Sequence, residues 1–95
     1  MNDVNEAYTK LAAEILATAV RDYRYMYKYL LIKQKKGTIK ESEERRIKHK
    51  LEYAESWFSS RYYYVLLKAI DADMDAEHII PFVRKRVEKE VEDGQ

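Results

Sequence analysis

The chain has 95 residues, of which 46% are apolar and 37% are charged, and its formal net charge is +1. This balance is too apolar for a disordered tail and too charged for a membrane protein. The chain has no cysteine, which excludes disulfides and thiolate metal sites. It has only two glycines and one proline, which disfavours the many turns of an all-β fold. We therefore predict one all-α domain over residues 1–95.

The first predicted helix runs from a cap at Asn2 or Asp3 to Gly37, which suits a helix C-terminus because glycine adopts a left-handed conformation readily. Lysines in its last turn favour the negative end of the helix dipole. Its apolar residues recur at steps of three, four and seven, which predicts one core face. That face comprises Val4, Tyr8, Leu11, Ile15, Ala19, Met26 and Leu30.

Alternating tyrosines mark the middle of this helix. Tyr23 and Tyr27 share a side with Met26 and Leu30, whereas Tyr25 and Tyr29 must line another side, because alternate residues of a helix point to opposite sides. The second pair is explained either by tyrosine's tolerance of partial exposure or by a contact surface with neighbouring arginines.

A second predicted helix follows the sequence Thr38-Ile39-Lys40-Glu41, which has the T-x-x-E form of a capping box. A connection of one or two residues between two long helices predicts an antiparallel hairpin. The predicted core positions of this helix are Ile47, Leu51, Ala54 and Phe58.

Two shorter helices complete the predicted bundle. Ser60 is a natural cap for a third helix, although one helix continuous with the second stays open. Asp75 is the preferred cap of a fourth, in which Pro81 predicts a kink or a division because it removes one backbone hydrogen bond. The predicted core positions are Tyr62, Val65, Leu66 and Ile70, then Ile79, Ile80, Val83, Val87 and Val91.

Charge is distributed unevenly along the chain. Residues 21–50 hold eleven basic residues against four acids, whereas residues 71–95 hold four basic residues against eight acids. The basic block is either a solvated face paired with Glu41, Glu43 and Glu44 or a patch that favours nucleic acid or an acidic protein groove. We place this block at the tip of the hairpin.

No residue set indicates catalysis, a metal or a cofactor. Asp71, Asp73 and Asp75 alternate as in a calcium loop, but the glycine and closing glutamate of such a loop are missing. We expect His49 to be solvated and His78 to be partly packed, and neither belongs to a metal-binding set. Without a catalytic motif, a membrane span or a secretion signal, we expect a cytoplasmic protein that is not an enzyme.

Two segments carry a family resemblance: A-V-R-D-Y-R at Ala19–Arg24, and E-S-W-F-S-S at Glu55–Ser60 with the later Ile79-Ile80 pair. They resemble small proteins encoded by phages and mobile elements of Gram-positive bacteria, and Pro81 departs from that pattern. The resemblance implies a phage setting. Small helical phage proteins of this kind include inhibitors of host defence, such as anti-CRISPR proteins.

The leading functional prediction is a phage-derived inhibitor that binds a bacterial defence effector, a CRISPR nuclease, by stoichiometric protein–protein contact. A nucleic-acid-binding phage regulator that uses the basic tip is the alternative, and a phage structural or assembly protein is the third candidate. Apolar residues on several faces of the first helix also predict a homodimer. The predicted partner-binding residues are Arg21, Arg24, Tyr25, Lys28, Tyr29, Lys35, Lys36, Arg45, Arg46, Asp71, Asp73 and Asp75.

Overall fold

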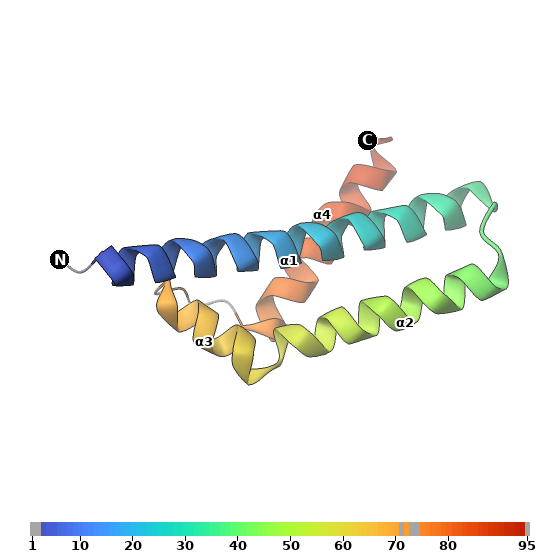
Figure 1. Cartoon of the computed structure of the whole chain (residues 1–95). Helices are drawn as coiled ribbons and strands as arrows, with labels where there is room; N and C mark the ends of the chain where they lie inside the picture. The colour runs from blue at the N-terminus through green and yellow to red at the C-terminus, as the bar shows by residue number, and fades with distance from the viewer. Residues whose placement is uncertain (1–2, 71, 73–74, 95) are drawn as a thin grey trace.

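The computed structural model describes residues 3–70, 72 and 75–94, and these ranges contain four α-helices and no strand. The helices are α1 (Asp3–Lys36), α2 (Glu41–Phe58), α3 (Arg61–Ala69) and α4 (Ala76–Glu92). The long α1 forms an antiparallel hairpin with α2, and α3 turns back along the first part of α1. Helix α4 begins beside the end of α2 and crosses behind α1 (Figure 1). The predicted all-α class and the hairpin followed by two shorter helices are confirmed.

Local capping signals set most of the helix ends. Gly37 ends α1 with a φ of 68°, in the left-handed region that glycine adopts without strain. The Ser60 side chain accepts a hydrogen bond from the Tyr63 amide at 3.3 Å, and Asp75 accepts one from the His78 amide at 3.2 Å. Both predicted caps are confirmed, and α2 and α3 are separate helices.

The predicted capping box at Thr38 is wrong. The Thr38 amide donates to the Lys33 carbonyl at 3.1 Å and the Gly37 amide donates to the Gln34 carbonyl at 3.1 Å, which is the paired pattern of a Schellman motif. Thr38 therefore completes the end of α1 and does not begin α2. The second helix starts at Glu41 after Lys40, which makes no side-chain cap, so the connection is longer than predicted.

Pro81 lies within α4 and does not divide it, so that part of the prediction is also wrong. Proline has no amide to donate, so α4 loses one backbone hydrogen bond. The amide of residue 81 would have donated to the Glu77 carbonyl, four residues earlier. Both residues are exposed, so water can donate a hydrogen bond to that carbonyl instead.

The core follows one stripe on each helix. Tyr23, Tyr27 and Leu30 are buried on α1 as the tyrosine pattern predicts, but Tyr8 and Leu11 are 49% and 54% exposed, so the predicted face is wrong in the first third of the helix. There α3 covers α1, with Thr9 Oγ1 donating to the Ala69 carbonyl at 3.2 Å. Ala12, one position beyond the predicted Leu11 and thus rotated by about 100°, is buried instead. From Ile15 onward the prediction holds, because Ile15 packs against the core beside the buried Leu16.

The predicted positions of the other helices meet different outcomes. Tyr62 and Val65 of α3 are 54% and 41% exposed and so are wrong, while Leu66 is buried and Ile70 is half-buried. The predicted residues of α2 and α4 are all buried or packed against the core: Ile47, Leu51, Ala54, Phe58, Ile79, Ile80, Val83, Val87 and Val91.

Candidate functional site

A polar network lies where α4 crosses the hairpin. Arg84 of α4 donates from Nε to the Tyr23 hydroxyl at 2.9 Å and from Nη2 to Glu55 Oε2 at 2.6 Å. The Tyr23 hydroxyl donates to the same Glu55 oxygen at 2.6 Å. Each polar group thus has a partner on another helix, and the network holds α1, α2 and α4 together.

A neighbouring tyrosine extends the network. The Tyr27 hydroxyl donates to Glu88 at 2.5 Å, and the Arg84 guanidinium lies 5.0 Å from the centroid of the Tyr27 ring. Burial raises the pKa of Tyr23 and of Tyr27 to about 12. Both hydroxyls therefore stay protonated at neutral pH, which suits a structural role and not that of a base.

Three of the predicted partner-binding residues contact α4 instead of projecting freely. Arg24 and Lys28 both pair with Glu90, Lys28 at 3.1 Å, and Lys35 Nζ donates to the Val91 carbonyl at 3.2 Å. Hydrogen bonds from Lys28 and Arg24 lower the pKa of the Glu90 carboxyl. These cations therefore bind the C-terminal half of α4 to α1.

The exposed side of α4, next to Glu90, carries a set of residues that could not be recognised from net charge alone. Phe82, Lys85, Arg86 and Lys89 are exposed at spacings of three, four and seven residues, which puts them on one face of the helix. We call these four residues the α4 outer face. Their spacing is visible in the sequence, but the net negative charge of residues 71–95 conceals it.

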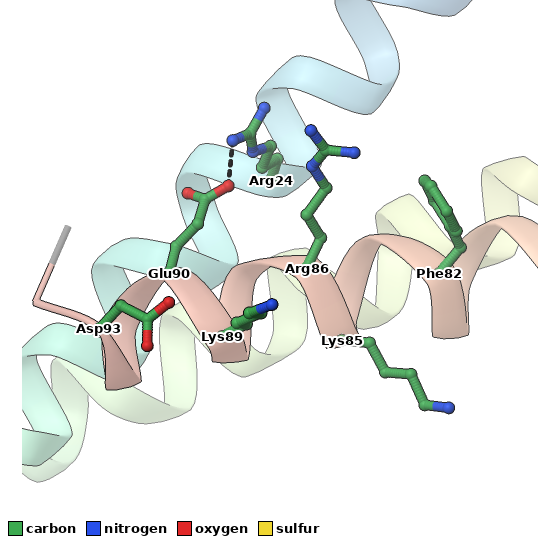
Figure 2. Close-up of a pocket in the computed structure, with 7 residues that line it drawn as sticks. All are labelled: Arg24, Phe82, Lys85, Arg86, Lys89, Glu90 and Asp93. Carbon is green, nitrogen blue, oxygen red and sulfur yellow. Dashed lines mark hydrogen bonds and ion pairs between the residues drawn. The ribbon is translucent and has the colours of Figure 1, made fainter.

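The α4 outer face borders a shallow hollow of about 830 Å³, which Arg24, Glu90 and Asp93 also line (Figure 2). Arg24 of α1 reaches Glu90 at its edge, as the dashed line in Figure 2 marks. Within the described part of the chain, no carboxylate lies within ion-pair distance of Lys85, Arg86 or Lys89. The three side chains are exposed, and the carboxylates of Glu90 and Asp93 lie at the border of the same hollow.

A second hollow, also lined by Arg24, lies between α1, α3 and the start of α4, and we call it the apolar groove. Its volume is about 570 Å³, and it is lined by Leu16, Ala17, Val20, Arg21, Arg24, Tyr25, Tyr63, Leu67, Ile70 and Ile79. Leu16, Tyr63 and Leu67 are buried at its base, whereas Val20 and Ile79 are half-buried. Arg21 is exposed and Tyr25 is 64% exposed, so a cation and an aromatic ring flank an apolar surface.

The remaining predicted cations lie at the tip of the hairpin. Lys36 and Arg45 are exposed, while Arg46 lies 3.9 Å from Glu43. The Tyr29 hydroxyl donates to the same Glu43 carboxylate at 3.3 Å. Because α1 rises about 1.5 Å per residue, Lys36 is roughly 20 Å along the helix from Arg21. The single basic block of the sequence is thus two separate regions.

The acidic turn has a structural role at its described end. Asp75 caps α4 and its carboxylate lies 2.6 Å from the His78 ring, which lowers the pKa of Asp75. The His78 side chain is 75% exposed, so its predicted packing is wrong, whereas His49 is exposed as predicted. The predicted contact residues Asp71 and Asp73 lie outside the described residues. The described residues contain no cluster of three or more candidate metal ligands.

Exposed apolar side chains are also present near the N-terminal end of the bundle. Tyr8 and Leu11 of α1 and Tyr62, Tyr64 and Val65 of α3 are 41% to 57% exposed. They are of the kind that a dimer interface buries, and the homodimer stays a prediction.

No family model, curated protein or solved structure matches the chain. The resemblance to small phage proteins therefore stays a prediction. In the described ranges, no helix combines the length and the apolar character needed to cross a membrane.

Proposed function

We propose that this protein is a phage-derived, non-catalytic inhibitor that binds a bacterial defence effector of the CRISPR nuclease class by stoichiometric protein–protein contact. The observation that carries the binding role is the apolar groove, in which Arg21 and Tyr25 flank buried aliphatic side chains. Tyrosine and arginine around a desolvated apolar centre are the usual composition of a binding hot spot. The choice of effector rests on the resemblance to phage proteins.

The groove suits an element of a partner protein more than a small substrate. It is open and shallow, and three helices form its walls. An apolar helix face that packs into such a groove is held by anchors spaced along one stripe. The polar network at Arg84, Tyr23 and Glu55 joins α1 to α4, which are two of the three helices that form the groove, so little ordering of these two helices is required on binding.

Cleavage assays with purified CRISPR nucleases from Gram-positive hosts test the proposal. We expect inhibition to become complete near a one-to-one ratio of protein to nuclease, because a blocking protein does not turn over. Tyr25→Ala and Arg21→Glu should each weaken inhibition about tenfold or more, since truncation of a hot-spot residue costs about 2 kcal/mol.

Tyr53→Ala is the matched control for the tyrosine variant. Tyr53 is 76% exposed on α2 and does not line the apolar groove. This variant should inhibit like the wild type, and all three variants should keep the wild-type helix content in circular dichroism. Absence of inhibition at a tenfold excess, across several nucleases, would lead us to abandon the proposal.

The alternative of a nucleic-acid-binding regulator that uses the hairpin tip has one supporting observation. Lys36 and Arg45 are exposed there, and neither has an ion-pair partner among the described residues. Glutamates on the same turns of α2 reduce the net positive charge of the tip, since Glu43 lies near Arg46 and Glu44 pairs with Lys48. Charge reversal at Lys35, Lys36, Arg45 and Arg46 should abolish nucleic-acid binding if the tip is the site.

A further inference from the structure

Several charged residues of α4 bind the hairpin, whereas others are exposed to solvent. Its acids Glu88 and Glu90 bind Tyr27 and the Arg24–Lys28 pair of α1, and its first cation, Arg84, binds Glu55 of α2. Three further cations remain on the outer face at Lys85, Arg86 and Lys89. These three cations give this face of α4 a positive charge along most of its length, and the exposed carboxylates of Glu92 and Asp93 lie only at its C-terminal end.

An aromatic ring lies on the same face. Phe82 is 54% exposed and precedes Lys85, Arg86 and Lys89 by three, four and seven residues. An exposed phenylalanine has no hydroxyl to hydrate, so its exposure is harder to explain by solvation than that of a tyrosine. Cations that follow a backbone, together with an aromatic ring on which a base stacks, are the two components of single-stranded nucleic-acid binding.

We propose that the α4 outer face binds a single strand of nucleic acid, with phosphates at Lys85, Arg86 and Lys89 and one base stacked on Phe82. The four residues span about 10 Å of helix, at 1.5 Å per residue, which is enough for two or three nucleotides. Arg24 of α1 borders the same hollow, where it pairs with Glu90 (Figure 2). This site differs from the apolar groove and from the hairpin tip.

A single strand suits this face better than a duplex or an acidic protein. Stacking on Phe82 requires a base whose face is free, and the bases of a duplex are already stacked on each other. A polymer of carboxylates would satisfy the cations but would offer no flat ring to stack on Phe82. The proposal goes beyond the inhibitor function, because it needs no nuclease.

Fluorescence anisotropy with a labelled oligothymidylate of about twelve nucleotides, and with the matching oligouridylate, tests the site. We expect binding that weakens between about 50 mM and 200 mM salt, with a log–log slope near −2 for three phosphate contacts. The triple variant Lys85→Glu, Arg86→Glu, Lys89→Glu should lose binding. The control is Lys36→Glu, Arg45→Glu, Arg46→Glu, which makes the same change in charge at the tip and should bind almost as tightly as the wild type.

Substitutions of Phe82 distinguish base stacking from a general attraction of the cations to polyanions. Phe82→Leu keeps an apolar side chain and should weaken binding on the order of tenfold, whereas Phe82→Trp should bind at least as tightly as the wild type. All of these residues are exposed, and circular dichroism should give wild-type helix content for each variant. The glutamine version of the α4 triple variant repeats the test without introducing negative charge.

Four results would overturn this inference. They are no binding at low salt, equal loss of binding in the two triple variants, indifference to Phe82→Leu, and polyglutamate of matched charge competing as well as the oligonucleotide. Loss in the tip variant alone would locate nucleic-acid binding at the hairpin tip instead. None of these results depends on nuclease inhibition, so the inhibitor proposal stands or fails separately.

Discussion

The tip of the hairpin and the outer face of α4 both carry cations, but different interactions neutralise charge at each. At the tip, the acids are neighbours in sequence, since Glu43 and Glu44 lie three and four residues from Arg46 and Lys48. On α4, Glu88 and Glu90 bind residues of α1 that are more than sixty positions away. The local acids therefore reduce the net positive charge of the tip. On α4, the acids bind α1, so their charge does not offset that of the exposed cations.

Charged residues in the two regions have different roles. Arg24, Lys28 and Lys35 belong to the basic block in sequence, yet they bind α4 and help to fix its orientation. Lys85, Arg86 and Lys89 belong to an acidic segment, yet they form a second exposed positive surface. Net charge over a window of sequence therefore does not locate an exposed charged surface where tertiary ion pairs neutralise one sign of charge.

The crossing of α1 and α4 should be the most sensitive point of the fold. Val87 is 0% exposed, so Val87→Asp buries a carboxylate without a partner. We expect the free energy of unfolding to fall by about 3 kcal/mol or more, measured by urea denaturation. Val65→Asp is the matched control, because Val65 is 41% exposed on α3 and should change that free energy by less than about 0.5 kcal/mol.

Removal of a tyrosine hydroxyl should lower the free energy of unfolding at the crossing of α1 and α4 but not on the exposed surface. Tyr23→Phe removes a hydroxyl that binds both Glu55 and Arg84, and we expect a loss of about 1–2 kcal/mol in the free energy of unfolding. Tyr25→Phe removes an exposed hydroxyl and should cost less than about 0.5 kcal/mol. Equal losses in the two variants would contradict the assignment of the network as a stabilising feature.

Alkaline pH should weaken the same network. Burial raises the pKa of Tyr23 and Tyr27 to about 12, above the value near 10 of the unfolded chain, so the folded state holds these protons more tightly. The resulting stabilisation is present below pH 10 and is lost as pH rises from about 10 to 12. Denaturation across this range should show a steeper fall for the wild type than for the Tyr23→Phe, Tyr27→Phe double variant. Parallel curves would exclude these tyrosines as the cause.

The smallest effects should come from the tip. Arg46→Ala and Lys48→Ala each remove an exposed ion pair within α2. We expect each to change the free energy of unfolding by less than about 0.5 kcal/mol, with little further change at high salt. A loss of more than about 1 kcal/mol, in the same denaturation assay, would show that the tip is held by more than local pairs.

Local sequence determined the helices and most of their ends. Gly37, Ser60 and Asp75 act within their own turns, so their caps could be predicted without knowledge of the fold. Thr38 shows where this reasoning fails, because the T-x-x-E pattern fits a cap of α2 while the backbone uses Thr38 to end α1. The same residue suited two local motifs, and sequence alone did not choose between them.

By itself, the sequence determined an all-α chain, a hairpin at Gly37 and the division of the tyrosines into a buried pair and an exposed pair, because helical period and capping act over a few residues. Only the tertiary structure decided which side of α1 is buried near its start, where α3 packs on α1 and Ala12 and Leu16 are buried while Tyr8 and Leu11 stay exposed. It also decided which cations are free, because the partners of Arg24, Lys28 and Arg84 come from helices that are distant in sequence. The physical reason is that side-chain pairing depends on which helices cross and at which residues, and no local spacing encodes that crossing.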